Sequence, residues 1–249
     1  VTSISGGAFG NCTSLTSIKI PDSVTSIDDY AFSGCISLTS IMIPNRVTEI
    51  GGYAFENCTS LTSITIPDSV TEVSDSAFIG CTSLTAINVA IENQYYASAN
   101  GVLYNKDKTT IIYYPVGKKD KNYKIPDGVT SIGEYAFDGC TSLTSISIPN
   151  SVTEIGDSAF SGCTSLTTIN VAIENQYYAS ANGVLYNKDK TELIRYPDGK
   201  KDKNYTIIDG VTSVGRLAFY GCTSFTSVTI PNSVTEISSS AFRNCTSLT

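Results

Sequence analysis

The chain has 249 residues, of which 16% are charged, and its formal net charge is −7. This length allows one or two globular domains or one repeat array. The acidic balance argues against a general nucleic-acid-binding protein, whose surface would be basic, and the absence of any run of about 18 apolar residues predicts no transmembrane segment.

A unit of 23 residues recurs along the chain, and its first copy reads VTSISGGAFGNCTSLTSIKIPDS. Repeats of this length are typical of solenoids, in which stacked coils share one core. We therefore expect a single array over residues 1–249. Because both ends of the sequence interrupt a repeat, we also expect the chain to be a piece of a longer protein. The eight copies begin at Val1, Val24, Val47, Val70, Val129, Val152, Val211 and Val234.

Each repeat is expected to contain one short strand. Leu15, Ile18 and Ile20 have the spacing of alternate inward residues, and Pro21 ends the strand because it cannot donate to a continuing ladder. The residues up to the next strand are long enough for a parallel return, which predicts a β-dominated solenoid with a parallel sheet on its concave face. The segment before each Ala-Phe pair, such as residues 28–31, is predicted to form a short helical turn on the convex side.

One phenylalanine per repeat is expected to fill the core. Stacked coils would place each ring beside its equivalents, with roughly 1.5–3 kcal/mol gained for each fully buried side chain. The predicted spine consists of Phe9, Phe32, Phe55, Phe78, Phe137, Phe160, Phe219 and Phe242.

Two inserts, at about residues 91–124 and 173–206, interrupt the 23-residue spacing and share the stretch IENQYYASANGVLYNKDKT. Residues 101–104 and 109–115 are predicted to pair as a β-hairpin, and residues 183–197 to repeat it. Whether the strand near Ile112 or Ile194 joins the main sheet as an additional coil is left open by the spacing. The inserts hold 11 of the 15 tyrosines and 12 of the 16 lysines and arginines.

The inserts therefore supply the candidate ligand-binding residues, because insertions in a repeat array often emerge on one face and carry binding. Tyrosine offers apolar area with a polar group, which suits both protein and glycan ligands. The alternative is that the tyrosines only pack the hairpins and the lysines keep their edges from pairing with other chains. The candidates are Tyr104, Tyr114, Lys118, Lys119, Tyr186, Tyr196, Lys200 and Lys201.

No residue pattern suggests catalysis, a cofactor or a metal site. The chain has no histidine, which removes the usual general base, and no Cys-x-x-Cys pair for zinc. The eight cysteines occupy one repeat position, where stacking predicts a buried ladder of free thiols. They are Cys12, Cys35, Cys58, Cys81, Cys140, Cys163, Cys222 and Cys245.

The repeat, with its Ala-Phe pair and Cys-Thr-Ser-Leu-Thr-Ser-Ile-x-Ile-Pro run, resembles the BspA-like, or Treponema pallidum type, leucine-rich repeats. The resemblance covers nearly the whole chain. It implies a curved, right-handed leucine-rich-repeat solenoid, and an occurrence on surface proteins of bacteria and some protists that bind host proteins or mediate adhesion. It carries no catalytic residues and names no ligand.

These observations predict a non-catalytic protein, secreted or on the cell surface, that binds a protein or glycan as an adhesin does. The alternative is a structural spacer that projects another domain and has no ligand of its own. Uncapped terminal repeats would also allow end-to-end contact with further repeats.

Overall fold

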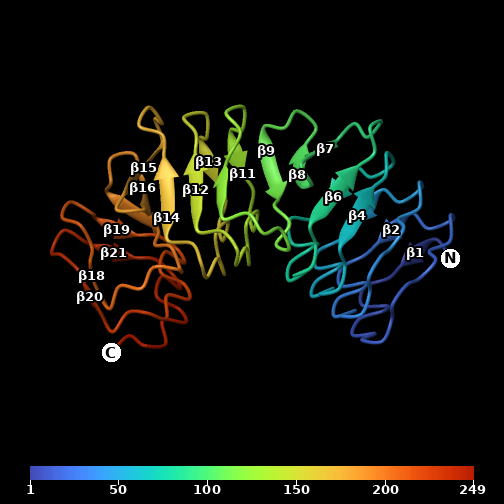
Figure 1. The fold of residues 1–249 in the computed structure, drawn as a ribbon, viewed down its shortest axis with the longest axis horizontal. Coiled ribbons are helices and arrows are strands. Elements are labelled where there is room, and N and C mark those ends of the chain that lie inside the picture. The colour runs from blue at the N-terminus through green and yellow to red at the C-terminus, as the bar shows by residue number, and fades with distance from the viewer. The chain divides into compact units, whose positions relative to one another are not determined.

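The computed structural model describes residues 1–249, which form short strands joined by turns (Figure 1). It contains no helix, and hence none able to cross a membrane. The chain forms two compact units: unit 1 comprises Val1–Lys118 and Ile132–Phe137, and unit 2 comprises Lys119–Ser131 and Asp138–Thr249. One repeat makes one circuit of the solenoid, which we call a coil.

Unit 1 contains two separate sets of parallel strands and one group of antiparallel strands. The four-stranded parallel sheet consists of β1 (Ser3–Ile4), β2 (Ser26–Ile27), β3 (Glu49–Ile50) and β5 (Glu72–Val73), and the second parallel pair of β4 (Ser63–Ile66) and β6 (Ala86–Val89). The antiparallel group is β7 (Tyr96–Ala99), β8 (Val102–Asn105) and β9 (Thr110–Tyr113).

Unit 2 repeats this plan, and strand β11 (Ser131–Ile132) lies at the boundary of the units. One parallel sheet has the order β10 (Asn122–Lys124), β12 (Ser145–Ile148) and β14 (Thr168–Val171). A second parallel pair is β18 (Asn204–Thr206) with β20 (Ser227–Thr229), and β13 (Glu154–Ile155) lies next to β11 in its sheet. A further sheet has the order β15 (Tyr178–Ala181), β16 (Val184–Asn187), β17 (Glu192–Arg195), β19 (Ser213–Val214) and β21 (Glu236–Ile237).

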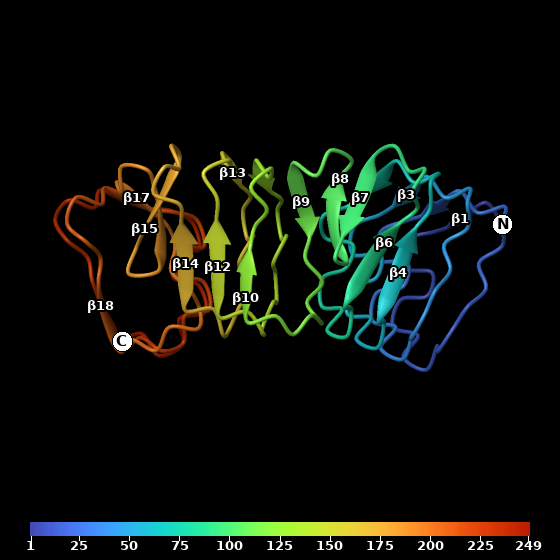
Figure 2. The ribbon, with the colours of Figure 1, turned by 45° about the horizontal axis from the view of Figure 1, so that its top comes forward.

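The predicted parallel strands at the Leu-x-x-Ile-x-Ile segment form in the third to seventh repeats, whereas the first two repeats have only an isolated bridge there, between Lys19 and Met42. Figure 2 shows β12 and β14 side by side, and Ile146 pairs with Ile169 one repeat later. A second row of strands, at the Val-Thr-Ser-Ile segment, was not predicted. There Ile4 pairs with Ile27 across coils, and the third to seventh repeats each contribute two short strands instead of one.

The predicted helical turns are wrong. Around residues 28–34 the N–H groups do not bond four residues back: Tyr30 N–H donates to Gly52 O, and Phe32 N–H to Ala54 O, both in the next coil. Tyr30 also has a φ of 59°, a left-handed value that an α-helix excludes. Tight turns bonded across coils therefore replace the helical turns.

The predicted hairpins form, because β8 pairs antiparallel with β9 and β16 with β17. The strands near Ile112 and Ile194, whose place the spacing left open, belong to additional coils, so most of each segment is not a separate insert. In unit 2, β17 pairs in parallel with β19, and β18 pairs in parallel with β20. Tyr196 N–H donates to Ala218 O at 2.8 Å, as Phe219 N–H does to Ala241 O, and the Tyr196 ring stacks on Phe219 at 5.4 Å. Only β15 and β16 leave the repeat pattern, and β7 and β8 do the same in unit 1.

The phenylalanine spine fills the core as predicted. In unit 1 the rings of Phe9, Phe32, Phe55 and Phe78 are stacked with centroids 5.1–5.8 Å apart and nearly parallel planes. Phe32 and Phe55 are fully buried. The spine thus fills the space between neighbouring coils with stacked aromatic rings.

Candidate functional site

Asn93 redirects the chain out of the repeat pattern. Its buried side chain donates from Nδ2 to Pro67 O (2.7 Å) and Val70 O (2.9 Å), in the preceding coil. Its Oδ1 accepts hydrogen bonds from the N–H groups of Tyr95 and Tyr96, both at 2.8 Å. These four bonds fix the start of β7 against the end of the coil.

Asn175 makes the same four bonds in unit 2, with distances of 2.8–2.9 Å, and so fixes the start of β15. The sequence analysis did not single out either asparagine. The signal was present in the IENQYY motif, which is identical in both copies. An asparagine in a loop is ordinarily read as a turn residue, and its burial follows only from the fold.

The loop between β8 and β9 holds two lysines beside β7. Asn105 Oδ1 accepts hydrogen bonds from Thr109 N–H and Thr110 N–H at 2.8 and 2.9 Å, which shapes the loop. Lys106 Nζ donates to Asn93 O, and Lys108 follows with a left-handed φ of 57°. Lys188 and Lys190 are the equivalent residues of unit 2.

Each unit therefore contains one groove between the end of a parallel strand, the neighbouring antiparallel strand and this loop. The N-terminal groove measures about 340 Å³ and the C-terminal groove about 460 Å³. The N-terminal groove is lined by Val89, Ala90, Ile91, Tyr96, Ala97, Ser98, Lys106 and Lys108, and the C-terminal groove by Val171, Ala172, Ile173, Tyr178, Ala179, Ser180, Lys188 and Lys190. Every lining residue is identical in the two grooves.

The groove rims combine apolar side chains with positive charge. Ile91 is 88% exposed and Ile173 is 85% exposed, and Tyr95 and Tyr177 beside them are each 53% exposed. Neither lining contains an acidic residue. A large aliphatic side chain so fully exposed at equivalent places in both units is the kind of patch that marks an interaction surface.

The four tyrosines predicted as ligand contacts lie in the core. Tyr104, Tyr114, Tyr186 and Tyr196 are at most 2% exposed. Burial raises the pKa of Tyr196 well above its usual range, and the carboxylate of Asp202, which accepts a hydrogen bond from its hydroxyl, raises it further. These tyrosines are neutral packing groups in this structure.

The four predicted lysines divide into two pairs. Lys118 Nζ lies 5.8 Å above the Tyr114 ring and donates to Asn100 O at the tip of the β7–β8 hairpin, and Lys200 does the same with Tyr196 and Asn182. These two hold the hairpin tips. Lys119 and Lys201 are exposed. The structure therefore does not gather the eight candidates into one surface.

Most cysteines of the ladder are buried free thiols. The Cys58 thiol donates to Phe32 O at 3.2 Å, and burial raises the pKa of Cys58 to about 12. The predicted burial is confirmed for six of the eight, with Cys12 exposed and Cys245 half-buried. A buried thiol with a raised pKa is a poor nucleophile because the thiolate is the reactive form.

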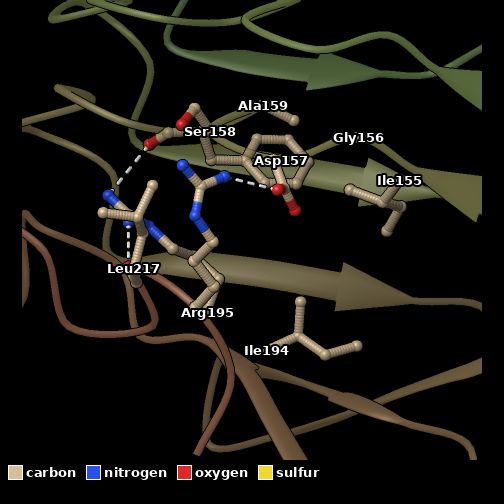
Figure 3. A pocket seen from close by; sticks show the side chains of 10 residues that line it. Ile155, Gly156, Asp157, Ser158, Ala159, Ile194, Arg195 and Leu217 are labelled. Atoms are coloured by element: carbon tan, nitrogen blue, oxygen red, sulfur yellow. Dashed lines mark hydrogen bonds and ion pairs between the residues drawn. The ribbon is translucent and has the colours of Figure 1, made fainter. Parts of the chain in front are cut away.

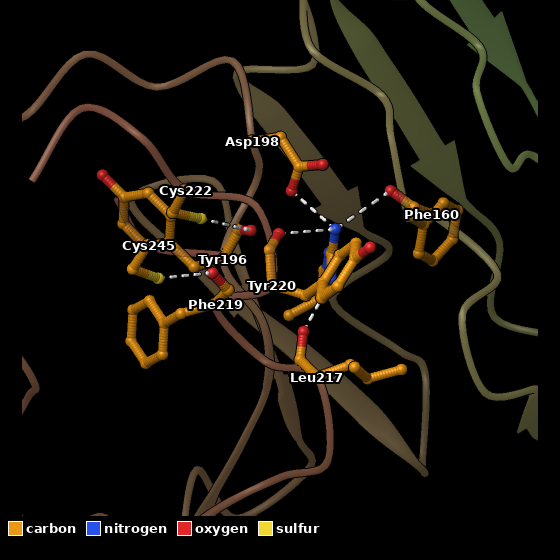
Figure 4. A network of polar contacts seen from close by, with 9 residues as sticks. Phe160, Tyr196, Asp198, Leu217, Phe219, Tyr220, Cys222 and Cys245 are labelled. Carbon is orange, nitrogen blue, oxygen red and sulfur yellow. Dashed lines mark hydrogen bonds and ion pairs between the residues drawn. The ribbon is translucent and has the colours of Figure 1, made fainter. Parts of the chain in front are cut away.

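A buried ion pair supports the additional coil of unit 2 (Figure 4). Arg195 Nη2 lies 2.6 Å from Asp198 Oδ1, and Arg195 also donates to the carbonyl oxygens of Leu217 (2.6 Å) and Phe160 (3.4 Å). Burial raises the pKa of Asp198, and the Arg195 charge opposes that rise. The equivalent residues of unit 1 are Tyr113 and Val116, so the two units fill this place differently.

A small cavity lies next to Arg195 and is partly enclosed by Asp157 and Leu217 (Figure 3). Arg216 Nη1 lies 2.5 Å from Asp157 Oδ2 at its edge. The volume is about 60 Å³, which is room for only a few water molecules. This cavity is too small for an organic substrate, so the grooves are the candidate site.

Comparisons with known proteins agree with the repeat pattern. The model of the BspA type leucine-rich repeat region matches six copies, over residues 2–119, 113–202 and 198–249. No curated protein matches the chain.

Solved structures with the same fold come from bacteria. The chain is 35% identical to a leucine-rich cell surface protein from Faecalibacterium prausnitzii, with a TM-score of 0.72. The match covers 98% of this chain and 61% of that protein. A leucine-rich repeat protein from Eubacterium ventriosum is 26% identical, with a TM-score of 0.66, and the match covers 98% of this chain and 80% of that one. The chain thus spans only part of the Faecalibacterium protein.

Replacing Asn93 by alanine is expected to destabilise unit 1 by about 2–5 kcal/mol, because four backbone groups lose their buried partner. Urea unfolding followed by circular dichroism measures the change. The neighbouring Gln94→Ala is the control, since Gln94 is exposed and donates only to Glu92 O within its own loop. A loss of unfolding free energy no larger for Asn93→Ala than for this control would contradict the stabilising role of the four Asn93 hydrogen bonds.

Asp138 is expected to make stability fall as pH rises. Burial raises its pKa to about 6, although the Arg195 charge lowers it, so between pH about 4 and 6 the folded state holds more protons than the unfolded state. Asp138→Asn should therefore be more stable than the wild type by about 1–3 kcal/mol at pH 7 and nearly equal to it at pH 4. Urea unfolding at both pH values measures this, and a difference independent of pH would refute it.

Proposed function

Because the chain belongs to the BspA-type leucine-rich repeat family, we propose that it is a non-catalytic binding module of a secreted or surface protein. The Faecalibacterium relative is a cell surface protein, which supports the location. The ligand is a protein or a glycan, and binding to it gives an adhesion-like role.

The observation that carries the proposal is the duplication of one groove. Two sites with identical linings recur in units that differ elsewhere in their cores, where Tyr113 in one unit stands for Arg195 in the other. Two equivalent weak sites raise the overall affinity when both engage one partner or one coated surface. Such a design suits adhesion to a repetitive or multivalent target.

Several residues predicted from the sequence as ligand contacts have structural roles near the grooves. Tyr104 lies on β8 and pairs with Ala97 in the groove wall, so it supports the wall from beneath. Lys118 and Lys200 hold the hairpin tips. Ligand contact is proposed for the groove residues, whereas the exposed Lys119 and Lys201 lie outside both groove linings.

A screen against arrayed glycans and extracellular-matrix proteins tests the proposal. The wild-type chain is expected to bind at least one target saturably. A variant with Ile91→Ser, Ile173→Ser, Lys108→Glu and Lys190→Glu should lose that binding by about a hundredfold, because it removes apolar area and reverses charge in both grooves. All four side chains are exposed or on a loop, so circular dichroism should show an unchanged fold.

The matched control reverses two lysines outside the grooves, Lys119→Glu and Lys201→Glu. It should retain most of the binding. Binding that survives in the groove variant would place the site elsewhere. No binding by any of the three proteins would favour the alternative, a spacer without its own ligand.

A further inference from the structure

The antiparallel strand that forms one wall of each groove is paired with another strand on one side only, although on β7 the Tyr96 N–H is bonded to Asn93 and the Ser98 hydroxyl to Val89 N–H. β7 is the last strand of its sheet, hydrogen-bonded to β8, and β15 is likewise paired only with β16. A strand with an open edge is a template for an extended segment of another chain. Ala97 and Ser98 at this edge are small, so a second backbone can approach closely.

The positive charge of the groove linings favours an acidic segment. Each groove is lined by two lysines and no acid, in a chain whose net charge is −7. The nearest acidic residues of the first copy in sequence, Glu92 and Asp107, are exposed and outside the lining. Lysines also protect edges from unwanted pairing. That protective role gives no reason for an isoleucine that is 88% exposed at the same rim.

We propose that each groove takes an extended acidic segment of a partner protein, with carboxylates on the lysines and an aliphatic side chain on Ile91 or Ile173. This inference rests on the proposed function and names its ligand class. The segment lies along β7 or β15, in the manner of an added strand. Alternation of acidic and aliphatic residues presents the acids to one face and the aliphatic groups to the other.

The two grooves differ in what lies beside them. The N-terminal groove shares Ala90 with a second hollow lined by Ile41, Met42 and Ile43, and Met42 is 82% exposed. The C-terminal groove shares Ala172 with a hollow that contains charged residues, among them Lys124, Asp127 and Glu174. The same core segment therefore binds both grooves, and an apolar extension favours the N-terminal one.

Fluorescence anisotropy with a labelled peptide of about eight alternating valine and glutamate residues tests the inference on the full chain. Two peptides per chain should bind, and the same peptide with glutamine in place of glutamate should bind at least about tenfold more weakly. Lys106→Glu with Lys108→Glu should remove one of the two sites and leave the other. Lys188→Glu with Lys190→Glu should remove the second.

Two controls separate groove contact from general attraction. Reversing Lys119 and Lys201 removes the same positive charge outside the grooves and should change the affinity less than about threefold. Adding two leucines to the end of the peptide should strengthen binding to the N-terminal groove, and Met42→Ser should cancel that gain without affecting the C-terminal groove.

The outcomes distinguish this inference from the proposed function. Loss of peptide binding in the groove variants, with retention in the control, supports the inference. Equal binding of the glutamate and glutamine peptides, or binding unaffected by the groove variants, overturns it. A carboxylate-bearing glycan bound in the grooves, with no peptide binding, also overturns it but leaves the proposed function intact.

Discussion

The backbone hydrogen bonds that join each Ala-Phe segment to the next coil are the constraint on which the rest of the structure depends. Phe32 N–H donates to Ala54 O and Phe55 N–H to Ala77 O, at 2.8 and 2.9 Å. These bonds engage the groups that a helix would use internally, and they set the rings of the spine 5.5 Å apart. The additional coils obey the same constraint, which holds each hairpin against one defined strand and so creates a groove.

The two units serve as an internal comparison. Tyr113 donates from its hydroxyl to Phe78 O at 2.7 Å, whereas Arg195, its counterpart, reaches Phe160 O and pairs with Asp198. Buried ion pairs carry a desolvation cost that an aromatic side chain avoids, so the two solutions differ in energy and in pH response. The groove linings are identical in the two units although these core positions differ, which is the pattern expected when the groove is the shared functional element.

Much of the fold follows from sequence, because the repeat fixes both the number of coils and the inward positions. The alternation of Leu15, Ile18 and Ile20 before a proline marks this segment locally, and its equivalents in the third to seventh repeats form strands such as β4. The tight turns before each Ala-Phe pair could not be distinguished from helical turns, because the deciding bonds run to the next coil, as from Tyr30 to Gly52, 22 residues away. Two-residue strands such as Ser3–Ile4 are too short to give a periodic signal.

The proposed grooves lie in the two segments that the sequence singled out, but the four tyrosines named as candidates are buried. Tyrosine composition drew attention to Tyr104 and Tyr114, which the additional coil buries. Ile91 gave no signal, because an isolated isoleucine in a sequence is ordinarily a core residue. Its exposure depends on Asn93, whose four hydrogen bonds turn the chain away from the core just after it.

Isoleucine-methyl NMR of the intact chain, titrated with the valine-glutamate peptide, tests the central claim most directly, because Ile91 and Ile173 each place a methyl group at a groove rim. The account predicts saturable shifts of these two resonances, with the buried isoleucines such as Ile27 and Ile146 unchanged. Shifts confined to other isoleucines, or none at any peptide concentration, would contradict it.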